Sequence, residues 1–313
     1  MGVATSSQQY QPHVSFPCLL QLEISVCKNL TCMPLFPNLE KPPRLTGSSC
    51  NPLQQTMNMK AISSVPSASN SSPPLSKLKS LSLCRIKDME FPPEQWLQNL
   101  ASLEELRIEG CDRLKSLSLS LFMQHLTSLK MLFISGCEEV DLFCDEDTQS
   151  VGVSPQITVL ENLEIFNCSN LISLPEGIGN LTALQKLRIY NLPCLVSLSE
   201  GIGNLTALQN LRICDLPCLV SLPEGIGNLT ALQTLRIFDL PCLVSLPEGI
   251  GSLTSLKRFE VRSCPNLTSL PSGMHRLSSL RTLKIIKCPH LKERYQKGIG
   301  EIAHVPNFQY RDS

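Results

Sequence analysis

The hydrophobic positions of this chain recur at a fixed interval of 24 residues over its second half. Leu174 is equivalent to Leu198, Leu222, Leu246 and Leu270. Each leucine is followed by a run similar to EGIGNLTALQ and then by the pattern L-x-x-L-x-I or a close variant of it. The alternation of apolar and polar residues in the last part of this pattern predicts a short β-strand with one buried face. Because no single unit can bury its own apolar face, the repeat predicts a solenoid of stacked parallel strands.

The same frame extends backwards through the first half of the chain with more variation. Five irregular units carry leucine or isoleucine at the buried strand positions. They begin at Leu19, Leu78, Leu103, Leu129 and Leu160. With the five regular units they make ten in matching phase. We therefore predict an α/β solenoid: one parallel sheet, with short 3₁₀ or irregular segments that return the chain to the next strand.

Proline, glycine and cysteine hold set positions in the repeat. Prolines bend the chain out of the strand layer, and glycines permit the turn that follows. Ser199 replaces one of these prolines, so we expect that turn to be slightly looser. A position in the turn after the strand is often cysteine, which we interpret as a small buried side chain, because no histidine or basic partner lies at a regular offset from it. These cysteines are Cys27, Cys111, Cys137, Cys168, Cys264 and Cys288.

Composition excludes several functional classes. The 313 residues include 27 Lys+Arg and 27 Asp+Glu, and this balance argues against binding to nucleic acid. No apolar run approaches the roughly 20 residues of a transmembrane helix, so we expect no transmembrane segment. The 15 cysteines show no zinc-binding spacing, and residues 1–17 do not resemble a signal peptide. We therefore predict a reducing, cytoplasmic environment with free thiols.

Two segments interrupt the repeat and define the expected organisation. Residues 34–74 are rich in Pro, Ser and Asn, and we expect a partly disordered insertion between a first unit at 19–33 and the solenoid at 75–291. Residues 138–154 form an acidic insertion, whose spacing does not match a calcium-binding loop. The terminal segments are 1–18, an N-terminal extension, and 292–313, a tail or cap.

Polar residues between the buried strand positions are expected on the open face of the sheet. Equivalent positions of consecutive units hold three arginines, which repel one another unless Asp215, Asp239 or another group neutralises them. An arginine and aromatic surface of this kind suits an acidic patch of a protein partner. The alternative is that the arginines are only copies of a duplicated unit. The candidate partner-binding residues are Arg188, Arg212, Arg236, Tyr190, Phe238, Arg262 and Lys284.

Five longer motifs stand out: the repeat CxxLxxLPEGIGNLTALQxLRI, PLFPNLE at 34–40, PPLSKLKSLSL at 73–83, FPPEQWLQNLASLEELRIEGC at 91–111 and CPHLKERYQKGIGEIAHVPNF at 288–308. Together they resemble the C-terminal repeats of plant intracellular nucleotide-binding leucine-rich-repeat (NBS-LRR) disease resistance proteins. The resemblance covers nearly the whole chain. It implies a leucine-rich-repeat horseshoe with its parallel sheet on the concave face. It also implies a role in plant innate immunity, through binding of a pathogen effector, a guarded host protein or a nucleotide-binding domain.

We predict a non-catalytic recognition module that needs neither a cofactor nor a metal. The sequence has no phosphate-binding G-x-x-x-x-G-K-[ST] loop and no G-x-S-x-G or H-E-x-x-H motif. Two alternatives stay open: an extracellular leucine-rich-repeat receptor fragment or inhibitor, in which the N-x-[ST] sequons would carry glycans, and an adaptor or scaffold. The first six residues fit the myristoylation pattern, and acylation of Gly2 alone would give only weak membrane association.

Overall fold

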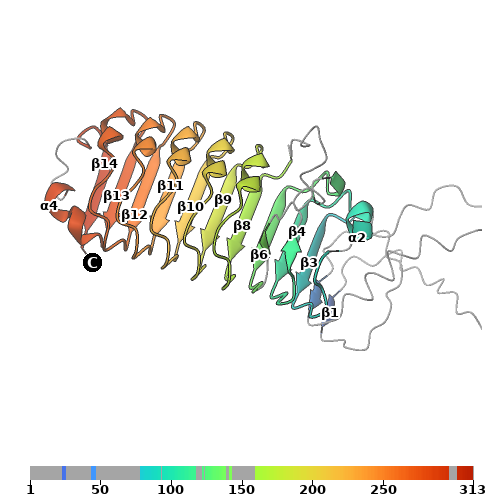
Figure 1. The fold of residues 1–313 in the computed structure, drawn as a ribbon. Helices are drawn as coiled ribbons and strands as arrows, with labels where there is room; N and C mark the ends of the chain where they lie inside the picture. Colours follow the sequence, from blue (N-terminus) through green and yellow to red (C-terminus); the bar gives the residue numbers. More distant parts are fainter. Residues whose placement is uncertain are drawn as a thin grey trace, which may run out of the picture.

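The computed structural model describes residues 23–25, 44–46, 78–92, 94–117, 122, 124–138, 141–142, 159–295 and 302–312. Within these residues, 12 strands form one open parallel sheet in which the order of the strands follows the chain (Figure 1). The strands are β1 (Glu23–Ser25), β2 (Arg44–Thr46), β3 (Ser80–Cys84), β4 (Glu105–Glu109), β6 (Met131–Ser135), β8 (Asn162–Phe166), β9 (Lys186–Tyr190), β10 (Asn210–Cys214), β11 (Thr234–Phe238), β12 (Arg258–Arg262), β13 (Thr282–Ile286) and β14 (Asn307–Arg311). This is the leucine-rich-repeat solenoid that the sequence predicts.

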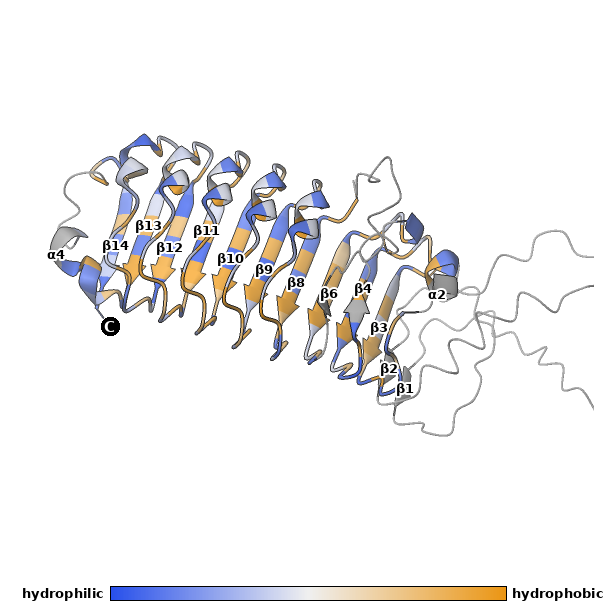
Figure 2. Ribbon diagram, viewed as in Figure 1, coloured by the Kyte–Doolittle hydropathy of each residue, from blue (hydrophilic) through white to orange (hydrophobic). Residues whose placement is uncertain are grey.

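The register of the sheet follows the sequence repeat residue by residue. Leu187 pairs with Leu211 and Ile189 with Ile213, and all four side chains are buried. The residues between them face outward, so apolar and polar side chains alternate along each strand. The buried side chains meet leucines and isoleucines of the return segments, which lie between one strand and the next, and together they form one continuous core. Figure 2 shows this repetition as hydrophobic bands on successive strands.

Short helices form most of the return segments; those of the regular repeats lie along one edge of the solenoid, whereas α4 lies at its C-terminal end (Figure 1). They are α2 (Glu94–Asn99), η2 (Glu176–Asn180), η3 (Glu200–Asn204), η4 (Glu224–Asn228), η5 (Glu248–Ser252), η6 (Ser272–Arg276), η7 (Pro289–Leu291) and α4 (Lys292–Tyr295). Pro223 precedes η4 with φ −67° and ψ 146°, and Ser199 precedes η3 with φ −65° and ψ 145°. Ser199 also accepts a hydrogen bond from the backbone of Gly201 at 2.9 Å. The expectation of a looser turn at Ser199 is therefore wrong, because serine keeps the angles of proline and adds a cap.

A residue with positive φ follows each of the strands β3 to β13 in the large sheet. Asn191 (φ 53°) and Asp215 (φ 57°) are examples, and asparagine and aspartate tolerate this left-handed conformation better than most residues do. The N–H of Asn191 then donates to the carbonyl of Cys214 in the next repeat at 3.1 Å. In some repeats leucine, for example Leu192, stands at the turn position that cysteine occupies elsewhere, and its side chain cannot form a hydrogen bond. In those turns the inter-repeat backbone bond satisfies the backbone instead.

Three of the expected segments contain short strands in the described residues. Residues 34–74, expected to interrupt the repeat, contribute strand β2, which pairs with β1 and β3. The acidic insertion at 138–154 contributes β7 (Asp141–Leu142), which pairs with β5 (Ser116–Leu117) in a separate sheet. The tail at 292–313 ends in β14, which extends the large sheet. Short apolar segments in these regions pair with neighbouring strands, although their sequences lack the full repeat.

Other expectations fall outside the described residues. They concern the extension at 1–18 with Gly2, the turn at Cys27 and most of the two insertions. Among the helices of the described part, none is long and apolar enough to cross a membrane.

Candidate protein-binding surface

The candidate residues lie on the outward face of the sheet in two columns. Strand pairing places Arg188 beside Arg212 and Arg212 beside Arg236. The first column continues through Glu260 to Lys284. Its members are the third residues of β9 to β13, as the sequence predicts. The face that carries the candidate residues is called the basic sheet face below.

The second column contributes the aromatic rings. Tyr190, Cys214, Phe238 and Arg262 occupy the last positions of β9 to β12, in register. The ring of Tyr190 stacks on that of Phe166 with the centroids 4.6 Å apart and the planes within 8° of each other. Such stacking fixes both rings and leaves a flat aromatic surface next to the arginine column.

Phe238 lies between two guanidinium groups. The guanidinium carbon of Arg262 is 4.8 Å from the centroid of the Phe238 ring, and that of Arg212 is 5.6 Å from it. Both distances are in the range of cation–π attraction. The Nε atoms of these two arginines are buried, and neither has a hydrogen-bond partner within the described structure. Packing against the ring therefore helps to hold both positive charges in place.

Ion pairs terminate the arginine column at both ends. Nη1 of Arg188 donates to Oε1 of Glu164 on β8 at 2.7 Å. At the other end, Arg236 approaches Glu260 on β12, with 3.8 Å between Nε and Oε2. Asp215 and Asp239 form no ion pair with the arginines in the described part of the chain, and both are exposed residues of the left-handed turns.

Glu260 is the centre of a charge cluster that sequence reasoning missed. Its side chain is only 4% exposed, and within the described residues four cations lie within 4 Å of its carboxylate. Arg262 is the nearest at 3.0 Å, followed by Arg258 at 3.4 Å, Arg236 at 3.8 Å and Lys284 at 3.9 Å. One negative charge cannot neutralise four positive ones, so a net positive charge remains on this part of the face.

The signal for this cluster is present in the sequence. Arg258, Glu260 and Arg262 alternate on one strand, so all three share a face. Arg236 and Lys284 stand at the position of Glu260 in the units before and after it. Alternation along the strand and the 24-residue repeat along the chain, taken together, therefore predict the charge cluster around Glu260.

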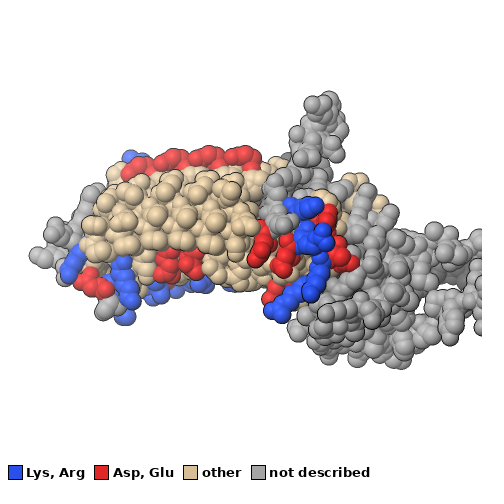
Figure 3. Space-filling view, turned by 60° about the horizontal axis from the view of Figure 1, so that its bottom comes forward, with Lys and Arg blue, Asp and Glu red and all other residues tan. Residues whose placement is uncertain are grey.

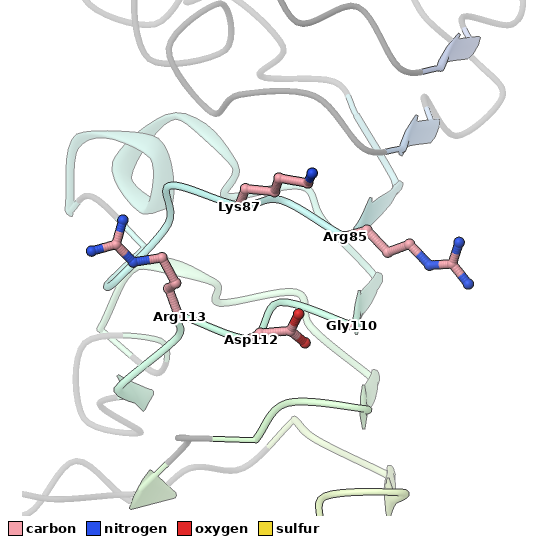
Figure 4. Close-up of a pocket in the computed structure, with 5 residues that line it drawn as sticks. All are labelled: Arg85, Lys87, Gly110, Asp112 and Arg113. Carbon is pink, nitrogen blue, oxygen red and sulfur yellow. The ribbon is translucent and has the colours of Figure 1, made fainter.

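A pocket elsewhere on the solenoid is a weaker candidate. It measures about 390 Å³ and is lined by Arg85, Lys87, Gly110, Asp112 and Arg113. Figure 4 shows that the side chains of Arg85 and Arg113 point away from each other rather than towards a common centre. Arg113 is moreover paired with Glu90 at 3.2 Å. The pocket therefore does not present convergent groups to a ligand.

Three of the turn cysteines, Cys111, Cys137 and Cys168, are poorly suited to nucleophilic catalysis. Cys111, Cys137 and Cys168 are buried, and the thiol of Cys137 donates to the carbonyl of Ser135 at 3.4 Å. Burial raises the pKa of Cys111 to about 12 and also raises the pKa of Cys168. A buried thiol with a raised pKa is a poor nucleophile. These three cysteines therefore act as small buried residues, in agreement with the interpretation from sequence.

Comparisons with known proteins agree with this architecture. Residues 4–138 match the family model of plant disease resistance protein RPS2-like leucine-rich repeats, and residues 197–308 match that of a leucine-rich repeat region. A search of curated proteins found no match.

Several solved structures are similar to this chain. The leucine-rich repeat domain of the type III effector XopL is 26% identical and has a TM-score of 0.48, over 70% of this chain and 71% of that one. An internalin from Listeria monocytogenes is 18% identical with a TM-score of 0.34, over 76% of each chain. A leucine-rich-repeat protein of Leptospira interrogans is 17% identical with a TM-score of 0.34, over 94% of this chain and 96% of that one. The repeat, the parallel sheet and the two family matches together show that this chain is a leucine-rich-repeat region, a protein-interaction module, and the match over residues 4–138 supports the plant disease-resistance type.

Proposed function

We propose that this chain recognises a protein partner through the basic sheet face and that this recognition serves plant innate immunity. The partner is a pathogen effector, a guarded host protein or a nucleotide-binding domain, and the surface that it offers is acidic. One observation supports the proposal above the others: strands β8 to β13 carry seven basic and two acidic residues, all at outward-facing positions.

The arrangement of these charges suits binding more than stability. Arg212 and Arg262 are held against Phe238, so a partner would not have to order them. Aromatic rings and arginines are the residue types that contribute most to protein interfaces. An acidic partner would relieve the repulsion along the column and would also be steered towards it.

The test compares the native chain with the variant R188E/R212E/R236E. Proximity labelling in leaf tissue would identify proteins that lie next to the native chain, and each purified protein would then be titrated against both forms. We expect the triple reversal to weaken binding by at least tenfold, because three attractive contacts become repulsive. Unchanged affinity would show that the partner does not bind through the basic sheet face.

Two controls accompany this test. The variant K257E/R276E/R281E changes the net charge by the same amount at exposed positions outside the strands, and it should bind like the native chain. The variant R188Q/R212Q/R236Q removes charge without placing new carboxylates beside Glu164 and Glu260. It should show an intermediate affinity while keeping the circular dichroism spectrum of the native chain.

The proposed location is the cytoplasm. The described cysteines all carry free thiols, and those at the turns are buried in the core. Expression in plant tissue followed by treatment with a deglycosidase tests the extracellular alternative. A shift in mass at the sequons Asn180, Asn204 and Asn228 would contradict the cytoplasmic proposal.

A further inference from the structure

Acidic and basic residues of the regular repeats lie on different faces. Between residues 167 and 256 the basic residues are Lys186, Arg188, Arg212 and Arg236, and all of them belong to strands. The acidic residues of the same span all belong to return segments. They are Glu176, Glu200, Asp215, Glu224, Asp239 and Glu248. The return side of these repeats is therefore purely acidic, opposite in sign to the basic sheet face.

The return side also exposes a row of apolar side chains. Ile172 is 62% exposed, Val196 43%, Val220 56% and Val244 53%. They occupy one equivalent position of consecutive repeats, and the N–H of Val196 donates to the carbonyl of Ile172 at 2.9 Å. The four residues therefore form a continuous row, called the apolar ladder below. Each member is β-branched and exposed on a face where the repeat could have accommodated a polar residue.

The apolar ladder has a defined end. The next repeat carries Thr268 at this position, whose N–H and Oγ1 both bond to the carbonyl of Val244. The fold thus accepts a polar residue at this site. Exposed cysteines lie in turns two residues before each valine. They are Cys194, Cys218 and Cys242.

Acidic residues border the apolar ladder on both sides. On one side, four glutamates of the 3₁₀ helices form a row, called the acidic ladder below: Glu176, Glu200, Glu224 and Glu248. Figure 3 shows this acidic row along the upper edge of a broad uncharged face. Asp215 and Asp239 lie on the other side, in the turns that follow β10 and β11.

The acidic ladder is held rigidly. Oε2 of Glu200 accepts from the backbone of Gly225 at 2.9 Å, and Oε2 of Glu224 accepts from Gly249 at 3.1 Å. Each carboxylate is thereby fixed to the next repeat while its residue stays exposed. The charges are therefore in position before any partner arrives, which lowers the entropy lost on binding.

We propose that this return face is a second docking surface, which binds a basic amphipathic α-helix of another protein. The rungs of the apolar ladder follow the repeat spacing of about 5 Å. The apolar stripe of a helix presents a side chain every 3 or 4 residues, which is a rise of about 5 Å. A helix of about ten residues, parallel to the solenoid axis, would place one apolar side chain on each rung. Lysines or arginines on its flanks would meet the acidic ladder and the two aspartates.

The charges of this face decide against other occupants. A second copy docked through the same face would bring acidic rows together, which is unfavourable. An anionic membrane would be repelled for the same reason. The proposed surface is independent of the basic sheet face, so each can fail without the other.

The experiment uses the full chain and a synthetic 14-residue helical peptide with leucines at positions 2, 5, 9 and 12 and lysines on both flanks. The measured quantity is the rate at which iodoacetamide alkylates Cys194, Cys218 and Cys242. With 100 µM peptide and a Kd near 10 µM, alkylation of these thiols should slow about tenfold. Alkylation of Cys84 and Cys214, which lie on the opposite sheet face, should not change.

Two variants separate the contribution of the apolar ladder from that of the two aspartates. V196T/V220T/V244T copies the residue found at Thr268 and should weaken peptide binding by at least tenfold, since it removes exposed methyl groups from the contact. D215N/D239N introduces the residue that Asn191 already has at the equivalent turn. It should weaken binding several-fold at low salt and much less at 0.5 M NaCl.

Three outcomes would overturn the proposal. The first is equal protection of the native chain and of the threonine variant. The second is equal binding of a control peptide in which glutamates replace the lysines. The third is a concentration-dependent dimer that the threonine variant abolishes, because a second copy would then be the occupant.

Discussion

Nη2 of Arg262 donates a hydrogen bond to Oε2 of Glu260 across 3.0 Å, and the carboxylate that accepts it is almost completely buried. A buried carboxylate persists in a fold only where cations or donors satisfy it. Here the cations come from three adjacent strands, so Glu260 connects β11, β12 and β13 through their side chains. The same residue positions part of the basic sheet face and stabilises the solenoid beneath it.

Replacing Glu260 by glutamine should destabilise the fold. The variant E260Q keeps the shape of the side chain but leaves Arg236, Arg258, Arg262 and Lys284 to repel one another. We expect a loss of about 2 kcal/mol in the free energy of unfolding, measured by urea denaturation. The matched variant E164Q removes a more exposed carboxylate that has Arg188 as its partner and should lose less than about 1 kcal/mol. Equal losses would show that burial of Glu260 is unimportant.

Two neighbouring glutamates of the acidic ladder should respond differently to the same mutation. The N–H of Gly201 has two acceptors, Glu176 and Ser199, each at 2.9 Å, whereas the N–H of Gly225 has Glu200. In E176A the hydroxyl of Ser199 remains as an acceptor, so we expect little loss of stability. In E200A the bond to Gly225 is lost, with a decrease of about 1 kcal/mol in the free energy of unfolding.

Thermal and urea unfolding of both variants checks this difference. The variant S199P restores the proline of the other repeats and removes the second acceptor. In that background E176A should become as destabilising as E200A. The prediction fails if E176A and E200A are equally destabilising in the native background.

The sequence predicts the strands because their burial follows directly from the local pattern. Leu187 and Ile189 show why: two apolar residues that alternate with charged ones can only place one face in the core. Strand β2 was not predicted, because Arg44–Thr46 contains a single apolar residue. The segment is a strand because it pairs with β1 and β3. Pairing of this kind is a tertiary effect that periodicity does not report.

The position of the candidate site could be predicted from the sequence, but the ion pairs of its arginines could not. The column of Arg188, Arg212 and Arg236 follows from the repeat, since equivalent residues of a solenoid must stack. Which carboxylates pair with it does not follow, because Asp215 is close in sequence yet lies exposed in a left-handed turn without an ion pair to these arginines in the described structure. Glu260 is distant in sequence and close in space. The positions of side chains on neighbouring strands therefore determine which carboxylate pairs with the arginines.

The buried and exposed cysteines should differ strongly in reactivity. Burial raises the pKa of Cys111 to about 12, so almost none of this thiol is ionised at pH 8 in the folded chain. Cys194 and Cys218 are exposed. Alkylation at pH 8 followed by peptide mass mapping should label these two rapidly and Cys111 only after unfolding. Comparable rates would contradict the burial of the turn cysteines.

The same raised pKa makes stability depend on pH. The ordinary pKa of the thiol is 9.0, and in the folded chain that of Cys111 is raised to about 12. Between these values the unfolded chain loses a proton that the folded chain keeps, so the free energy of unfolding falls as pH rises from about 9 to 12. Urea titrations at pH 8 and pH 10 should show this decrease, and the variant C111A should show less of it. An identical decrease in C111A would assign the effect to other groups.

Relief of backbone strain at one turn should stabilise the fold. Ser263 adopts φ 50° after β12, whereas the equivalent turns hold Asp239 at φ 56° and Gly136 at φ 59°. The left-handed conformation costs an ordinary residue about 1–2 kcal/mol, and glycine loses roughly 0.5–1 kcal/mol of this advantage through its freedom in the unfolded chain. The variant S263G should therefore raise the free energy of unfolding by about 0.5 kcal/mol or more. D239G should gain less, because aspartate already tolerates this conformation, and a larger gain from D239G than from S263G would contradict the strain at Ser263.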